Sequence, residues 1–184
     1  MDKPLAIIIG AGFTGCALAH DLALRGFAVT VVERGEITSG TSGRTHGLLH
    51  SGGRYCVNDQ EAAIECIDEN ILLRKIARQC IEFNGGLFIA LNDEDEAYAE
   101  AFTQGAQACH IPIDRLTPAE ALRLEPAINP NLRLAFRVPD GAFDPLRLAL
   151  VFAATAAKNG ARFYAYTQVE KLIQDGRGRV TGVE

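Results

Sequence analysis

The N-terminal part of the chain alternates short apolar runs with one helical stretch. Leu5–Ile9 is an unbroken apolar run, which is typical of a strand buried on both faces of a parallel sheet. A glycine-rich turn follows it, and apolar residues near helical spacing then predict a helix over about 14–25, ended by Gly26. A second apolar run over 27–32 predicts another strand. The order strand, helix, strand favours an α/β fold built on a parallel central sheet.

The rest of the chain predicts a mixture of helices and strands. Capping signals mark three helix starts: Asn58 with Glu61, Thr117 with Glu120, and Asp144 before a proline. The expected helices cover about 58–80, 94–108, 118–125 and 145–158. The expected strands cover about 87–91, 111–116, 132–138, 162–167 and a hairpin of 169–174 with 180–184. Because a chain that stops on a hairpin strand leaves ladder groups unpaired, we expect a fragment of a longer protein.

The turn after the first strand has the spacing G-x-G-x-x-G. Gly10 allows the tight turn, Gly12 lets a diphosphate approach the main chain, and Gly15 lets the helix pack closely on the sheet. The free N–H groups at the start of the helix face the phosphates. Glu33 ends the second strand, where its carboxylate can accept hydrogen bonds from a ribose diol. The pattern therefore predicts a dinucleotide pocket.

The segment 34–55 is predicted to be a long polar loop, and loops of that length in compact domains are usually functional. It combines glycines with the hydroxyl groups of Thr41 and Ser42, two histidines, and the pair Arg54-Tyr55. A flexible linker is the alternative, but linkers rarely hold so many histidine, arginine and tyrosine side chains.

The composition is that of an ordinary globular chain, with 48% hydrophobic and 22% charged residues. The net charge is −5 without a basic run, so nothing favours a nucleic-acid partner. No apolar run reaches the length of a membrane span, and residues 1–4 leave no room for a secretory signal. The five cysteines lack a C-x-x-C motif, and the acidic run 93–96 fits a solvated first helix turn. These features predict reduced thiols in the cytoplasm and no metal site.

These motifs carry a resemblance to a known family. The glycine turn over 10–15, followed by Glu33, resembles the FAD-binding fingerprint of the D-amino-acid-oxidase-like flavoprotein superfamily. The segment 139–145 looks like the point where chains of that superfamily return to their FAD domain. Within it, the loop sequences 40–42 and 50–55 resemble FAD-dependent glycerol-3-phosphate dehydrogenases, closest to the catalytic subunit of the anaerobic enzyme. The resemblance covers the whole chain, but only the first third to half of the family's length.

The resemblance implies a Rossmann-like FAD-binding domain with a parallel central sheet, and part of an α+β substrate (cap) domain. The FAD-binding domain is expected over 1–80 and again over 141–184, with 81–140 in the cap domain. The implied activity is FAD-dependent oxidation of sn-glycerol 3-phosphate to dihydroxyacetone phosphate. Hydride would pass to the flavin, and electrons then to a quinone or an electron-transfer subunit. The expected location is the cytoplasm, including peripheral association with the inner face of the cell membrane.

The resemblance also assigns site residues. The following are expected to contact FAD: Gly10, Gly12, Phe13, Thr14, Gly15, Glu33, Arg34, Thr41, Ser42 and His46. Arg54 is expected to bind the substrate phosphate or another substrate oxygen, with a surface role or a contact to the FAD diphosphate as alternatives. Tyr55 lines the substrate pocket or packs structurally. His50 handles the proton or orients the flavin, with a structural role, and a base beyond residue 184, as alternatives.

Two other functions fit the same motifs. One is a sister flavoenzyme of the superfamily, such as a 2-hydroxyacid or amino-acid oxidase. The other is a non-catalytic module that binds a flavin or adenine nucleotide. NAD is the rival cofactor, and the long loop after Glu33 argues against it, since plain nicotinamide domains usually enter their next helix sooner.

Overall fold

The computed structural model describes residues 3–184 and shows two compact units. The first contains the chain up to His46 together with Asp144–Glu184, and the second is Gly47–Phe143. The predicted division kept 1–80 together, whereas the structure groups 47–80 with the second unit. The reason is that Leu48–Leu49 already pairs with residues 141–142. The assignment of the units to cofactor and substrate domains stays a prediction.

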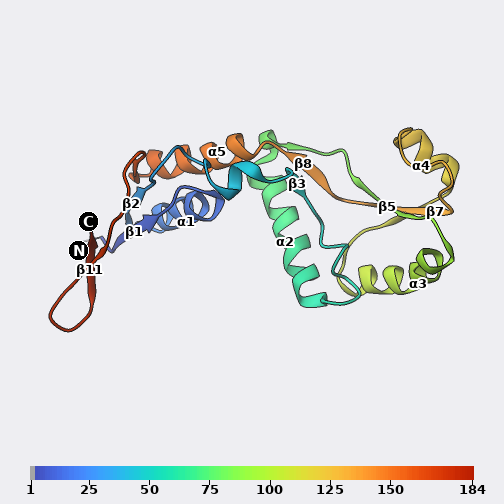
Figure 1. Cartoon of the computed structure of the whole chain (residues 1–184), viewed down its shortest axis with the longest axis horizontal. Helices are drawn as coiled ribbons and strands as arrows, with labels where there is room; N and C mark the ends of the chain where they lie inside the picture. The colour runs from blue at the N-terminus through green and yellow to red at the C-terminus, as the bar shows by residue number, and fades with distance from the viewer. Residues whose placement is uncertain (1–2) are drawn as a thin grey trace. The chain divides into compact units, whose positions relative to one another are not determined.

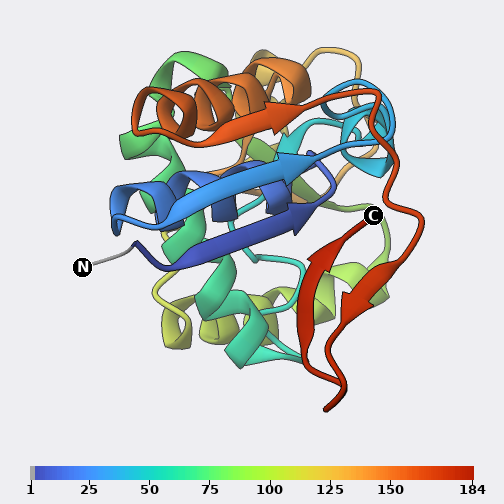
Figure 2. The ribbon, with the colours of Figure 1, turned by 90° about the vertical axis from the view of Figure 1, so that its left-hand side faces the viewer.

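A parallel sheet of three strands forms the first unit. Its order is β1 (Leu5–Ile9), β2 (Ala28–Val32) and β9 (Arg162–Tyr164). Two helices pack against each other, α1 (Phe13–Leu24) and α5 (Pro145–Lys158), and Figure 2 shows both behind the strands. Buried alanines on each helix allow this close approach. The fold confirms the predicted α/β class with a parallel, Rossmann-like sheet.

The last predicted strand of this sheet is shorter than expected. It ends at Tyr164 because the chain turns away at Tyr166, whose φ of +53° is left-handed. The N–H groups of Tyr166 and Thr167 donate to the carbonyl oxygens of Gly35 and Glu33 instead. The predicted hairpin is present as the antiparallel pair β10 (Leu172–Gln174) and β11 (Val180–Val183).

The second unit contains two antiparallel sheets (Figure 1). The small one has the order β3 (Leu48–Leu49), β8 (Gly141–Phe143) and β4 (Ile81–Glu82). The larger one has the order β5 (Gly86–Ala90), β7 (Leu134–Val138) and β6 (Asp114–Leu116). The α-helices are α2 (Gln60–Ile76), α3 (Asp93–Ala108) and α4 (Pro118–Leu124). Short 3-10 turns are η2 (Arg78–Cys80) here and η1 (Thr41–Arg44) in the first unit.

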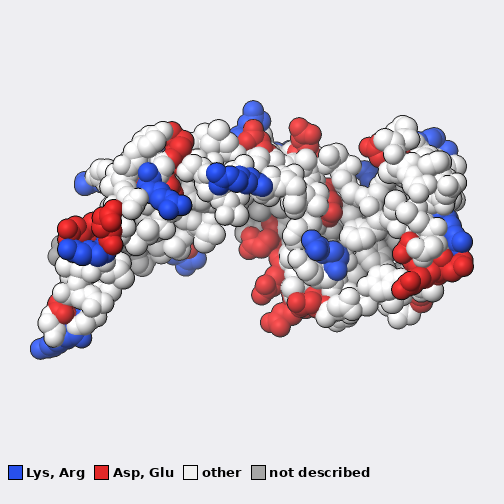
Figure 3. All heavy atoms as spheres, viewed as in Figure 1, with Lys and Arg blue, Asp and Glu red and all other residues white. Residues whose placement is uncertain are grey.

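The core of the second unit lies between α3 and the larger sheet. The ring of Phe102 lies 5.0 Å from that of Phe88 and 5.1 Å from that of Phe136, measured between centroids. Acidic side chains remain outside this core, and Figure 3 shows them gathered over α2 and α3. The run 93–96 forms the first turn of α3, as predicted, where acids favour the helix dipole.

The capping predictions are mostly confirmed. Thr117 and Glu120 form a reciprocal capping box, and Asp144 caps α5 by accepting from Arg147 N–H. The start of α2 is a correction, because Asp59 and not Asn58 accepts the hydrogen bond from the helix end.

Two further predictions of local structure were wrong. The expected turn at 139–141 instead leads into β8, which pairs on both sides. The expected apolar face of α2 buries Ile67 at 3% exposure but leaves Ile71 58% exposed. No helix among residues 3–184 has both the length and the apolar character needed to cross a membrane.

Candidate functional site

The glycine turn connects β1 to α1 in a conformation that only small residues allow. Gly10 has a φ of +103°, in the left-handed region that favours glycine. A Cβ added to Gly15 would lie 1.9 Å from the carbonyl oxygen of Gly10. Helix α1 therefore rests directly on the turn, and its N-terminus begins at Phe13, next to the site.

The turn η1 covers this glycine loop. Ser42 Oγ accepts a hydrogen bond of 3.0 Å from Phe13 N–H, at the first turn of α1. A Cβ added to Gly12 would lie only 2.7 Å from that same oxygen. The missing side chain at Gly12 thus leaves a space bounded by main chain and by a hydroxyl group, which suits the close approach of a phosphate.

The carboxylate of Glu33 is held against the same loop. Its two oxygens accept hydrogen bonds of 2.8 Å from the N–H groups of Ala11 and Gly35. These backbone donors, that of Ala11 first, hold the pKa of Glu33 below its ordinary value, so the group is ionised. Each carboxylate oxygen has a second lone pair, which remains able to accept from a ribose hydroxyl.

A cavity of about 250 Å³ lies between these groups, within the first unit. The predicted residues that line it are Gly12, Glu33, Arg34, Thr41 and Ser42. The lining residues that the sequence did not single out are Thr38, Ser39, Gly40 and Arg44. Arg34 and Arg44 bring positive charge, and the first turn of α1 carries no acid. The donor set fits an anionic dinucleotide.

The remaining predicted cofactor residues lie close by in sequence but do not line this cavity. Gly10 lines a neighbouring cavity together with Glu33 and Arg34. Phe13, Thr14 and Gly15 belong to the first turn of α1. His46 is exposed and follows η1. A signal for Arg44 was present in the sequence, because Gly43 before it packs where a Cβ would lie 2.3 Å from Thr38 O.

The three predicted catalytic residues gather in the second unit, just after β3. The ring of His50 meets the ring of Tyr55 edge-on at 5.9 Å between centroids. The guanidinium carbon of Arg54 lies 5.2 Å from the centroid of the same ring. A tight turn brings them together, since Gly52 has a φ of +86° and its carbonyl accepts from Tyr55 N–H at 2.9 Å. Arg54 is exposed, whereas His50 and Tyr55 are half-buried.

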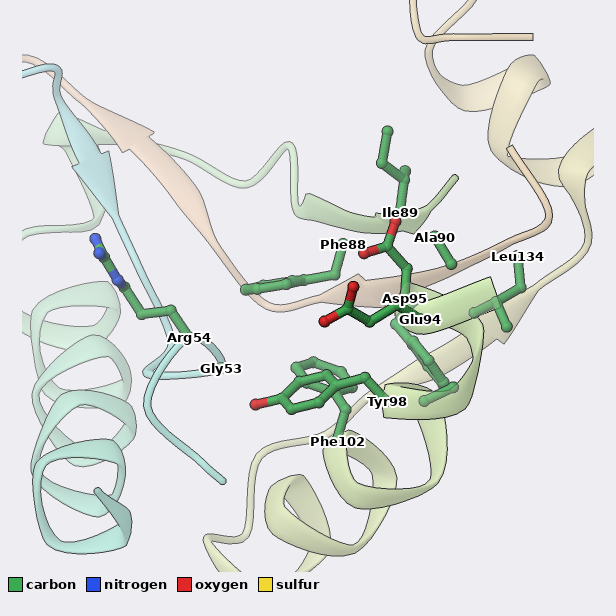
Figure 4. Close-up of a pocket in the computed structure, with 12 residues that line it drawn as sticks. Gly53, Arg54, Phe88, Ile89, Ala90, Glu94, Asp95, Tyr98, Phe102 and Leu134 are labelled. Carbon is green, nitrogen blue, oxygen red and sulfur yellow. The ribbon is translucent and has the colours of Figure 1, made fainter. Parts of the chain in front are cut away.

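A second cavity, of about 330 Å³, lies between this turn, α3 and the larger sheet. Figure 4 shows the rings of Phe88, Tyr98 and Phe102 directed from β5 and α3 toward Gly53 and Arg54. Its wall is aromatic and its polar groups include the carboxylates of Glu94 and Asp95. Sequence reasoning missed this cavity because its residues come from distant segments. Among residues 3–184, no cluster of three or more His, Cys, Asp or Glu side chains could hold a metal ion.

Known proteins share the sequence of this chain over nearly its whole length. The family described as FAD dependent oxidoreductase (DAO) matches residues 6–184. The chain is 47% identical over 182 residues to an anaerobic glycerol-3-phosphate dehydrogenase protein of Haloferax volcanii, covering 99% of this chain and 31% of that one. It is 47% identical over 177 residues to its namesake in Haemophilus influenzae, covering 96% and 31%. The chain thus spans about a third of the length of these curated relatives.

Solved structures show the same fold. Glycine oxidase from Geobacillus kaustophilus superposes with a TM-score of 0.80 at 25% identity, covering 94% of this chain and 49% of the other. The FAD-bound L-α-glycerophosphate oxidase from Mycoplasma pneumoniae gives 0.76 at 24% identity, covering 97% and 48%.

Proposed function

Because this chain belongs to the FAD-dependent oxidoreductase family, we propose that the complete protein oxidises sn-glycerol 3-phosphate to dihydroxyacetone phosphate with FAD as cofactor. The observation that carries the proposal is the 47% identity, over nearly the whole chain, to two proteins named anaerobic glycerol-3-phosphate dehydrogenase. The electrons pass on to a quinone or an electron-transfer subunit, from a cytoplasmic protein that associates peripherally with the membrane.

The first unit provides the groups that would hold FAD. The diphosphate lies against the main chain at Gly12 and the N-terminus of α1, and Arg34 and Arg44 neutralise its charge. The ionised carboxylate of Glu33 accepts from the ribose. Thr41 and Ser42 add hydroxyl groups on the η1 side. When bound, the flavin accepts a hydride from C2 of the substrate.

The second unit provides the cluster proposed to handle the substrate. Arg54 presents an exposed guanidinium, which suits a phosphate dianion because it can form two parallel charge-assisted hydrogen bonds. His50 takes the proton of the C2 hydroxyl as hydride leaves. Tyr55 contacts both side chains and holds them as one group.

The test is the visible spectrum of the complete purified protein under anaerobic conditions. Addition of sn-glycerol 3-phosphate should bleach the oxidised flavin bands, and dihydroxyacetone phosphate should appear in equal amount to the flavin reduced. Glycine, other amino acids and 2-hydroxyacids serve as the comparison panel. Bleaching by one of those instead would identify a sister oxidase, and bound flavin that no substrate reduces would identify a non-catalytic module.

A further inference from the structure

One buried amide in α2 connects two segments that are far apart in sequence. Asn70 is 1% exposed, and its Nδ2 donates to the carbonyl oxygens of Leu49 and Pro139, both at 3.2 Å. Its Oδ1 accepts from Arg74 Nε at 2.7 Å. A buried amide is stable only where such partners exist, so its place in α2 depends on these contacts. Figure 1 shows α2 next to β3 and β8, where the two carbonyl groups lie.

A buried carboxylate holds the same stretch of chain from the other side. Asp140 is 7% exposed, and its Oδ1 accepts a hydrogen bond of 2.6 Å from Ser51 N–H. Arg74 stabilises this segment further, since its Nη2 donates to the carbonyl oxygens of Pro139 at 2.6 Å and Asp140 at 2.9 Å. The charge of Asp140 also favours the charged form of Arg74 against the desolvation that lowers its pKa.

His50 is the residue between these two contacts. The carbonyl before it is held by Asn70 and the N–H after it by Asp140, so both peptide groups that flank His50 are fixed. The imidazole itself is held less firmly, because its Nδ1 is buried without a hydrogen-bond partner among residues 3–184. The hydroxyl of Ser51 is likewise buried without one in this part of the chain, so Ser51 contributes to this arrangement through its N–H.

We propose that Asn70 and Asp140 are positioning residues for the reaction: together they fix the main chain on both sides of His50 and so aim its imidazole at the substrate hydroxyl. The inference rests on the proposed function, in which His50 accepts that proton. A base is effective only within hydrogen-bond reach of the proton, and a displacement of about 1 Å can lower a rate by about 100-fold. Neither residue needs to touch the substrate to have this effect.

The experiment measures flavin reduction by stopped-flow mixing of the complete holoenzyme with sn-glycerol 3-phosphate without oxygen. Asn70→Ala should lower the limiting rate by about 10- to 100-fold, while the substrate Kd from the saturation curve changes by less than about threefold. The solvent deuterium isotope effect on the limiting rate should increase, because cleavage of the O–H bond then limits the reaction more strongly. The flavin content should equal that of the wild type.

A matched control separates positioning from general destabilisation. Ile67→Val removes one methyl group from the buried side of the same helix, where Ile67 is 3% exposed, and touches neither contact. It should retain the wild-type rate and isotope effect. An Asn70→Ala variant that also retains both would overturn the proposal.

A second pair keeps the proposal testable if Asn70→Ala does not fold. Asp140→Ala removes the acceptor for Ser51 N–H, whereas Asp140→Asn retains an amide oxygen at that place. The limiting rate should fall with alanine and recover with asparagine, and equal losses in both would refute the role of this hydrogen bond. If the wild-type flavin is not reduced by sn-glycerol 3-phosphate, the proposed function fails, and the positioning role fails with it. If only the variants behave like wild type, the positioning role alone is wrong.

Discussion

Gly12→Ala adds one methyl group at the point where a diphosphate would meet the main chain. The new Cβ would lie 2.7 Å from Ser42 Oγ, so one of the two groups must shift. Ser42 has a short side chain that can rotate away, which removes the hydrogen bond that it accepts from Phe13 N–H. A hydrogen bond of this kind contributes about 1 kcal/mol, so the fold should survive the substitution.

The effect on the cofactor should be larger. The methyl group keeps phosphate oxygens away from the N–H groups at the start of α1, and a hydrogen bond to a charged partner contributes about 1.5–3 kcal/mol. Loss of one such bond raises the Kd for FAD by roughly 10- to 150-fold. Gly12→Val, which is bulkier, should prevent flavin retention altogether.

The assay is a fluorescence titration of the complete apoprotein with FAD. Gly176→Ala is the control, because a Cβ there would meet nothing within 4 Å and the residue lies in the turn between β10 and β11. Its Kd should equal that of the wild type. If Gly12→Ala binds FAD as tightly as the control does, the diphosphate does not rest on this loop and the assignment of the pocket is wrong.

Three further predictions concern single side chains. Arg54→Ala should lower kcat/KM for sn-glycerol 3-phosphate by roughly 10- to 150-fold without changing bound flavin, and an unchanged value in steady-state assays would exclude Arg54 from the site. Since the pKa of Glu33 is depressed below 4.5 by the Ala11 and Gly35 donors, its stabilising contribution is complete above pH 4.5 and is lost as the pH falls through the lowered value. Thermal melts of Glu33→Gln should therefore depend less on acid pH than those of the wild type, and an identical dependence would contradict the role of the carboxylate. Burial raises the pKa of the Cys16 thiol to about 11, so iodoacetamide at neutral pH should modify the partly exposed Cys66 first, and peptide mass spectrometry showing equal rates would contradict it.

The first unit was largely predictable because its signals are local. The glycine turn, the helix after it and the strand that ends at Glu33 lie within one short stretch, and each residue has a separate steric or electrostatic reason to be there. The capping box at Thr117 is local in the same sense, since both of its hydrogen bonds close within three residues. Such patterns determine structure before any distant contact forms.

The second unit was less predictable because its geometry depends on pairing between distant segments. Strand β3 has two residues and exists because Leu49 meets Gly141 across the chain. The burial of Asn70 has the same origin, since helical periodicity alone would place a polar residue toward solvent. Exposed Ile71 on the same helix is the converse case.

The contacts of Asn70 also explain why a polar group occupies that buried position. The chain enters the second unit at Gly47 and leaves it at Phe143, and Phe143 N–H donates to the carbonyl of Gly47 at 2.8 Å. Apolar packing would hold these two segments together without fixing their register, because hydrophobic contact is not directional. A buried amide that donates to Leu49 and Pro139 fixes the register, since losing either bond in a low-dielectric interior carries a large penalty. The geometry that sets the main chain around His50 is therefore also the geometry that closes the unit.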